Sequence, residues 1–155
     1  MTQPELEAVA RNIIDSNLYM TLGTADETGK PWASPVYYAP HEYTEFLWVS
    51  APEATHSRNL AARPELGIVI FDSRTPINTG QAVYMSAVAE ELTGDDLDRG
   101  IEIFSRRSQQ HGADAWTSAD VLAPARLRLY RATASETFVL DRDDQRIPVR
   151  PASGR

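Results

Sequence analysis

Short β-rich segments follow one another directly in the first third of the chain, and this grouping limits the possible folds more than any other feature. The segments span residues 18–25, 31–39 and 45–50, and the stretches between them, residues 26–30 and 40–44, are rich in turn-forming residues. Turns this short join antiparallel neighbours, whereas parallel strands need a crossover of about a dozen residues or more. The spacing therefore predicts an antiparallel meander of three strands.

Proline residues set the position of the second strand in this predicted sheet. Pro31 and Pro35 both fall within residues 31–39, and proline has no N–H to donate to a neighbouring strand. We therefore expect this strand at a sheet edge or beside a bulge.

Later in the chain, strands and helices come in separate groups and do not alternate one by one. Capping residues and apolar periodicity predict helices over residues 2–16, 55–63 and 93–112, and strands over residues 66–71, 81–92, 126–133 and 137–140. Because residues 66–71 form a continuous apolar run, we expect that strand to be buried on both faces. The grouping favours an α+β fold, an antiparallel split β-barrel of about six or seven strands with two or three peripheral helices.

The length of 155 residues indicates one domain, because domains typically contain about 100–200 residues. Residues 1–141 carry all the predicted strands and are expected to form the split-barrel domain. Residues 142–155 are polar and include two prolines, so we expect them to form a C-terminal tail that is partly flexible.

The charge balance excludes two classes of partner. Fifteen basic and 22 acidic residues give a net charge of −7, and binding to nucleic acids or anionic membranes depends on neutralising phosphates. The absence of cysteine excludes disulfides and thiolate chemistry. No apolar run is long enough to span a bilayer, and the N-terminus lacks the pattern of a signal peptide, so we expect a cytoplasmic protein.

One loop combines the features of an anion-binding site. Residues 50–59 lead from a predicted strand into the start of a predicted helix, where backbone N–H groups lack intrahelical partners and the helix dipole favours an anion. Arg58 adds a planar donor suited to phosphate oxygens, and His56 adds a further donor. An ordinary helix capped by threonine or serine, with an exposed arginine, is the alternative interpretation.

The other polar residues do not assign catalysis or a metal site. His41 falls in a predicted turn and His111 at a predicted helix end, so both are expected to be exposed to solvent. The sequence has no glycine-rich phosphate loop and no helical pair of metal ligands. No catalytic residue is therefore assigned.

Several segments, in their order and spacing, resemble one known family over about residues 6–140. The similar segments are an opening hairpin, a strand before the loop, a short helix with its following strand, and a long strand, at residues 18–25 and 29–38, 46–50, 56–60 and 63–66, and 81–89. The chain thus resembles the pyridoxamine 5′-phosphate oxidase-like family of flavin-binding split barrels.

The resemblance implies a homodimer that holds one FMN in each of two grooves at the subunit interface. The phosphate would meet Ser50, Thr55, His56, Ser57 and Arg58, with Asn59 bracing the loop or touching the ligand. The isoalloxazine ring and ribityl chain would lie along Pro35, Val36, Tyr37, Trp48 and Val49, and Gln81 would reach the polar edge of the flavin or its phosphate. The implied function is a flavin-dependent oxidoreductase acting on an unidentified small-molecule substrate.

Two positions depart from the pattern of the family. His56 stands where many members have lysine, and Ala87 where many have glycine. A neutral histidine leaves phosphate binding to Arg58 and the backbone amides. The C-terminal substrate-binding segment of the true pyridoxamine phosphate oxidases also has no counterpart here, so oxidation of vitamin B6 is not expected.

Three alternatives remain open on the same fold. A deazaflavin-dependent reductase would need a basic groove for an anionic cofactor tail, and this chain has a single lysine, Lys30. A non-catalytic carrier or sensor of flavin or haem is the second alternative, with His56 or His111 as an axial ligand of haem. A split barrel with an empty groove is the third.

Overall fold

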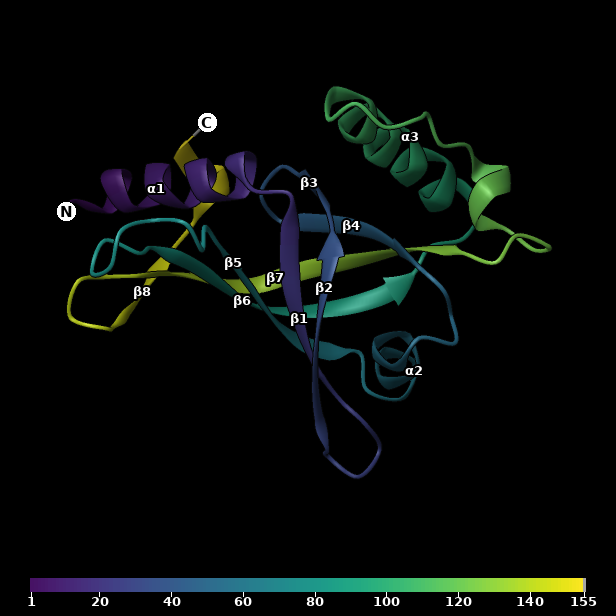
Figure 1. Cartoon of the computed structure of the whole chain (residues 1–155), viewed down its shortest axis with the longest axis horizontal. Helices are drawn as coiled ribbons and strands as arrows, with labels where there is room; N and C mark the ends of the chain where they lie inside the picture. Colours follow the sequence, from purple (N-terminus) through teal and green to yellow (C-terminus); the bar gives the residue numbers. More distant parts are fainter. Residues whose placement is uncertain (155) are drawn as a thin grey trace.

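Eight antiparallel strands form one curled sheet in the computed structural model of the chain, which describes residues 1–154 (Figure 1). The strands are β1 (Tyr19–Ala25), β2 (Pro31–Tyr37), β3 (Ala39–His41), β4 (Glu45–Ser50), β5 (Glu65–Phe71), β6 (Ala82–Glu91), β7 (Arg128–Leu140) and β8 (Arg146–Val149). The helices are α1 (Gln3–Ser16), α2 (Thr55–Ala62), α3 (Gly94–Gln110) and the 3₁₀ turns η1 (Ser118–Val121) and η2 (Pro151–Gly154). The predicted α+β split barrel is confirmed, with β3 and β8 as strands that the sequence did not predict.

The order of strands in the sheet is β2-β1-β5-β6-β7-β4-β3, with β8 paired to β7. Strands β2 and β4 thus lie near opposite ends of the hydrogen-bonded path, yet the curl of the sheet brings them into contact. We call this contact between β2 and β4, which has no ladder of backbone hydrogen bonds, the seam. The edge position of β2 agrees with the prediction drawn from Pro31 and Pro35.

The predicted three-strand meander is wrong. Strands β1 and β2 form a hairpin, but β4 pairs with β7, from Glu45 opposite Thr133 to Ser50 opposite Arg128. Alternating apolar residues fix which face of a strand is buried, but they do not select its partner. Strand β7, which lies more than seventy residues further along the chain, is the strand that pairs with β4.

Strand β7 is continuous, whereas the sequence predicted two strands, at residues 126–133 and 137–140. The register with β6 shifts between Ser86 and Ala87, which leaves Ser135 as an extra residue on β7. The Ser135 hydroxyl donates to the carbonyl of Ser86 at 3.1 Å. A β-bulge therefore accommodates the extra residue Ser135, and β7 continues through it as one strand.

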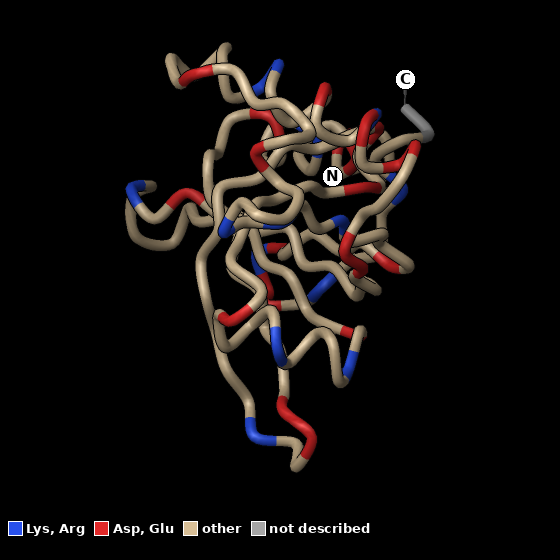
Figure 2. The backbone as a smooth tube through the Cα atoms, turned by 90° about the vertical axis from the view of Figure 1, so that its right-hand side faces the viewer, with Lys and Arg blue, Asp and Glu red and all other residues tan. Residues whose placement is uncertain are grey.

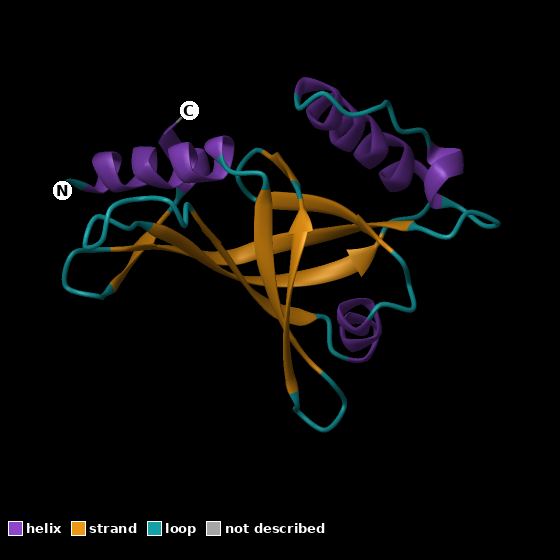
Figure 3. Cartoon of the chain, in the orientation of Figure 1, coloured by secondary structure: helices purple, strands orange, loops and turns teal. Residues whose placement is uncertain are grey.

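Strand β5 is buried on one face only, so the prediction of burial on both faces is wrong. Leu66, Ile68 and Ile70 are buried, but Val69 is half-buried and Phe71 is 49% exposed. Within one chain, the core and α1 cover the inner face of this sheet, and no helix covers the outer face at β5 (Figure 3). The outer apolar residues of β5 therefore face solvent in the described chain.

Two apolar clusters hold the elements together. Phe46 and Trp48 point into the barrel core with α1, while Leu47, between them, points into a second cluster under α3. We call this second cluster the α3 cluster; its buried members are Ala39, Leu47, Leu92, Leu97, Ile101, Phe104, Val121 and Leu129. Strand β4 is thus covered on both faces.

The segment after residue 141 carries regular structure in its described part. Strand β8 pairs with β7, and η2 lies against α1, where the Arg11 guanidinium donates to the carbonyl of Pro151 at 3.0 Å. The partial flexibility expected of residues 142–155 stays a prediction.

Charges are interspersed along the chain rather than gathered on one face (Figure 2). None of the helices formed by residues 1–154 is long and apolar enough to cross a membrane.

The C-terminal end of α1 is attached to the sheet by two side chains. The buried Tyr38 hydroxyl donates to the carbonyl of Ile14 at 2.7 Å, and burial raises the pKa of Tyr38. The Arg107 guanidinium lies 5.5 Å from the centroid of the Tyr38 ring and donates to the carbonyl of Asn17 at 3.0 Å. Donors therefore satisfy carbonyl groups that the end of a helix leaves free.

Replacing Tyr38 with phenylalanine tests this attachment. The variant leaves the Ile14 carbonyl without its buried donor, and we expect the free energy of unfolding to fall by about 1–2 kcal/mol. Chemical denaturation followed by circular dichroism measures it. The control, Tyr19→Phe at an exposed position, should change stability by less than about 0.5 kcal/mol. Equal losses in the two variants would contradict the proposed role of the Tyr38 hydroxyl.

Candidate functional site

The seam brings together two groups of residues that are distant in sequence. Residues 35–37 lie on β2 and residues 48–50 on β4, so the predicted flavin contacts of both strands flank the seam. Helix α2 packs against β1 and β2, and α3 packs against β3 and β4 (Figure 1). The two helices therefore border the region between these strands.

The predicted contacts divide between the inner and the outer side of the sheet. Val36 and Trp48 belong to the barrel core, where Trp48 is 0% exposed and stacks on Tyr130 with ring centroids 5.6 Å apart. Pro35 is exposed and Val49 is half-buried on the α3 side. Val36 and Trp48 thus pack the barrel, and Pro35 and Val49 are open to the outer side.

Tyr37 lies under α3 at the upper end of β2. Its ring meets Phe104 edge-on at 5.7 Å and Tyr19 at 6.2 Å. Its hydroxyl lies 2.6 Å from Nδ1 of His111, the C-cap residue of α3. His111 is exposed, as the sequence predicted, but it also makes a short hydrogen bond that no local pattern could have indicated.

The first turn of α2 has no capping side chain. Its N-cap residue is Ala54, and no side chain accepts a hydrogen bond there, whereas the Thr2 hydroxyl and the Glu5 carboxylate form a capping box on α1. The interpretation of α2 as an ordinary helix capped by threonine or serine is therefore wrong. Its first N–H groups are left for another acceptor, and Arg58 is exposed beside them.

The imidazole of His56 is turned toward the sheet. Its Nε2 lies 2.9 Å from the Ser50 hydroxyl, and both side chains are buried. Burial lowers the pKa of His56, so the ring is neutral near pH 7. His56 thus joins the end of β4 to the start of α2 and brings no positive charge to the loop.

Two buried polar atoms lack a hydrogen bond of good geometry within the described residues. They are the hydroxyl oxygen of Ser57, in the first turn of α2, and Nε1 of Trp48. A buried polar group without a partner costs about 1–3 kcal/mol. Trp48 belongs to the barrel core, whereas the Ser57 hydroxyl lies at the start of α2 beside Tyr130, whose pKa it lowers.

Asn59 fastens α2 to the first hairpin. Its side-chain amide donates to the Thr24 hydroxyl at 3.0 Å, and both residues are buried. The contact joins α2 to β1, and the two roles that the sequence resemblance implied for Asn59, bracing the loop or touching the ligand, stay predictions. Thr55 is half-buried at the start of the same helix.

Gln81 lies apart from the other predicted contacts. It is exposed just before β6, whereas α2 approaches β6 near its other end, where the Ala89 N–H donates to the carbonyl of Pro64 at 2.9 Å. Gln81 borders a hollow of about 440 Å³ together with Phe71 and Ile77. Within one chain, the structure does not bring Gln81 to the first turn of α2.

The outer face of the sheet carries a shallow hollow of about 850 Å³ over β1, β5 and β6. Gly23, Gly67 and Ser86 lie side by side across these strands, and exposed Trp32 and Val88 border them. A Cβ built on Gly67 would meet nothing within 4 Å, so the chain itself does not require glycine there.

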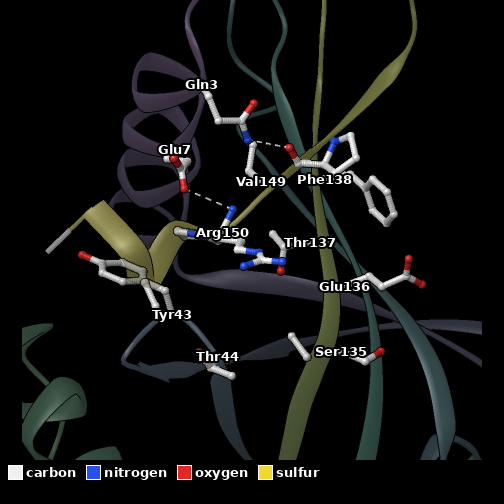
Figure 4. Close-up of a pocket in the computed structure, with 14 residues that line it drawn as sticks. Gln3, Glu7, Tyr43, Thr44, Ser135, Glu136, Thr137, Phe138, Val149 and Arg150 are labelled. Atoms are coloured by element: carbon white, nitrogen blue, oxygen red, sulfur yellow. Dashed lines mark hydrogen bonds between the residues drawn. The ribbon is translucent and has the colours of Figure 1, made fainter.

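A separate cavity of about 630 Å³ lies between α1, β7 and η2 (Figure 4). Gln3 Nε2 donates to the carbonyl of Pro148 at 2.8 Å, and the backbone N–H of Arg150 donates to the carboxylate of Glu7 at 3.3 Å. None of the predicted flavin contacts lines this cavity. Within residues 1–154, no group of His, Asp or Glu side chains is placed to hold a metal ion.

Comparison with known protein families shows to which family this chain belongs. The family described as pyridoxamine 5′-phosphate oxidase matches residues 6–141. The chain belongs to this family. The match spans every strand of the sheet except β8, so the family assignment covers the seam, α2 and α3. A search of curated protein sequences gives no match.

Solved structures share the fold of this pyridoxamine 5′-phosphate oxidase family member. A heme binding protein from Mycobacterium smegmatis has a TM-score of 0.73 at 20% identity, over 99% of this chain and 61% of that protein. The heme storage protein HutZ from Vibrio cholerae has a TM-score of 0.68 at 17% identity, over 86% of this chain and 94% of HutZ. An FAD-binding protein from Mesorhizobium loti has a TM-score of 0.62 at 17% identity, over 85% and 91% of the two chains. The chain thus spans about three fifths of the M. smegmatis protein.

The buried position of His56 predicts a pH effect on stability. Because burial lowers its pKa in the folded state below the ordinary value of 6.5, the unfolded state binds the proton more readily. The stability that the neutral, buried ring contributes is therefore fully present above pH 6.5. It is lost as the pH falls through the lowered pKa of the folded state. We expect wild type to lose stability relative to His56→Gln between pH 7.5 and 5, as measured by urea denaturation. A difference that stays constant with pH would contradict the assignment.

Proposed function

We propose that this protein is a homodimer that binds FMN and uses it as a flavin-dependent oxidoreductase on a small molecule. Membership of the pyridoxamine 5′-phosphate oxidase family and the split-barrel fold support a flavin. The observation that carries the proposal is the uncapped first turn of α2, which combines free N–H groups with exposed Arg58 and the buried Ser57 hydroxyl. These are donors that suit a phosphate.

Some residues around α2 would donate hydrogen bonds to the phosphate, and others would hold these donors in position. Backbone N–H groups of residues 55–57 and the Arg58 guanidinium act as donors, and the Ser57 hydroxyl adds a further donor. The Ser50–His56 contact and the Asn59–Thr24 contact hold the loop and the helix in position. Because His56 is neutral, Arg58 supplies the positive side-chain charge of this loop.

The isoalloxazine ring is proposed to lie along the outer side of the seam, beside Pro35, Tyr37 and Val49. The free edge of β2 offers backbone N–H and carbonyl groups to the polar edge of a ring, since no strand pairs there. Helix α3 and its cluster shield this end of the seam from water. When bound, the flavin supplies the hydride or electron transfer, and the chain binds and orients it.

The second subunit is proposed to cover the outer face of the sheet. Glycine inside a strand costs stability and often marks close approach by a ligand or another backbone. Gly23 and Gly67 are adjacent on this face, and packing within the chain does not require a glycine at Gly67. In a dimer, Gln81 of one copy would be free to reach the flavin of the other.

Haem is the second candidate cofactor. The Nδ1 atom of His111 faces Tyr37 and the ring is exposed, which leaves Nε2 available as an axial ligand. The absorbance spectrum of freshly purified protein distinguishes the two cofactors. Bands of oxidised flavin support the FMN proposal, a Soret band supports haem, and a colourless protein that ignores added FMN contradicts the proposed function.

Substituting Arg58 with alanine tests the phosphate site. Loss of a charged hydrogen bond should weaken FMN binding by about 1.5–3 kcal/mol, roughly tenfold to 150-fold in Kd. Fluorescence titration of the flavin-free protein measures it. Arg63→Ala, at the other end of α2, is the matched control and should bind FMN like wild type. An unchanged affinity of Arg58→Ala would exclude this assignment.

Substituting Gly67 with arginine tests the dimer face. The side chain has room in a single chain, so the variant should fold, but it would stand in the proposed interface. We expect wild type to sediment as a dimer and Gly67→Arg as a monomer. Gln109→Arg adds the same charge at an exposed position of α3 and should remain dimeric. A monomeric wild type, or a dimeric Gly67→Arg, would contradict the proposed interface.

A further inference from the structure

The hydrogen bond between Tyr37 and His111 joins two titratable groups that are 74 residues apart in the sequence. Tyr37 lies on β2 beside Pro35, at the outer side of the seam, and His111 ends α3. The edge-on contacts of Tyr37 with Phe104 and His111, both at 5.7 Å, hold the two rings in place. The pair therefore has a fixed geometry at the position proposed for the flavin ring.

Both groups have the protonation state that a proton relay needs at neutral pH. Burial raises the pKa of Tyr37 and outweighs the Arg107 side chain, which faces the hydroxyl and lowers that pKa, so the hydroxyl keeps its proton. Burial and the nearby Arg107 cation lower the pKa of His111, so its imidazole is neutral. A neutral imidazole has one N–H and one free lone pair, and it can take a proton on one nitrogen while it releases the other.

We propose that Tyr37 donates a proton to the molecule reduced at the flavin, and that His111 returns a proton from solvent to Tyr37. The proposal rests on the FMN binding proposed above. It assigns the resting state in which Nδ1–H of His111 donates to the Tyr37 oxygen, which leaves the hydroxyl proton of Tyr37 directed away from His111.

Each proton transfer of the relay breaks one bond to hydrogen and forms another. When an acceptor such as a quinone takes up the hydride that a bound reduced flavin would supply, one of its oxygens would become negatively charged. The Tyr37 O–H bond breaks and its proton forms an O–H bond on that oxygen. Nδ1–H of His111 breaks and its proton passes to the Tyr37 oxygen, while a hydronium ion or buffer acid protonates Nε2 on the exposed side of the ring. A final exchange with solvent restores the Nδ1–H form of His111.

The substrate class follows from this chemistry. The relay is useful for an electrophile that accepts two electrons and gains charge on an oxygen or nitrogen, because that atom needs a proton. One-electron acceptors, such as ferricyanide, need no proton from the protein. The comparison of a quinone with ferricyanide therefore separates proton donation from electron transfer.

The first test reads the resting tautomer in flavin-free protein, and it does not depend on activity. Nitrogen-15 NMR of the histidine rings should show His111 protonated on Nδ1 in wild type and in the control Tyr19→Phe. In Tyr37→Phe, which removes the acceptor oxygen, we expect the ring to shift to the Nε2–H form. A wild-type ring in the Nε2–H form would overturn the proposal, because the Tyr37 proton would then be committed to His111.

The second test uses FMN-loaded protein, reduced anaerobically and mixed with 1,4-benzoquinone or ferricyanide in a stopped-flow instrument. Tyr37→Phe should slow quinone reduction at least tenfold more than ferricyanide reduction. His111→Gly should show the same selective loss, and added imidazole should restore at least part of it, which a merely structural role of His111 would not allow. Equal slowing with both acceptors, or no rescue by imidazole, would overturn the relay.

The outcomes separate this proposal from the proposed function. If Tyr37→Phe still binds FMN but its reduced form loses the same factor in rate with quinone and with ferricyanide, the relay is overturned and flavin binding is left intact. Failure of wild type to bind FMN would overturn both.

Discussion

The pairing of β4 with β7 is the interaction on which the rest of the structure depends. It places Trp48 against Tyr130 inside the barrel and turns Leu47 to the opposite face, where α3 packs. It also carries β4 to the other end of the strand order from β2, so that the curl of the sheet creates the seam. The loop after β4 then sets the start of α2 beside the end of that strand through the contact between Ser50 and His56.

Two features of this chain have no explanation within the chain itself. Gly67 faces open space, and the first turn of α2 lacks a capping side chain. Each feature costs some stability in an isolated subunit. A phosphate at α2 and a second copy on the outer face would offset these costs, so both proposals follow from the same kind of observation.

A net charge of −7 is compatible with an anion site because the site is local. Backbone N–H groups at a helix start carry partial positive charge whatever the total charge of the protein is. His56 is neutral and turned inward, which leaves Arg58 as the cation that this loop exposes. The overall charge describes the solvated surface, and the proposed anion site depends on one turn of one helix.

The sequence by itself determined the features that form within a few residues. Apolar periodicity located all three α-helices and most strands, and a capping box marked the start of α1, because these signals act within a few turns of a helix or one strand. The tertiary structure alone decided that β4 pairs with β7, that β7 runs through a bulge, and that His111 meets Tyr37. Such contacts join residues tens of positions apart, and many pairings bury similar apolar area, so only the packing of the whole chain selects among them.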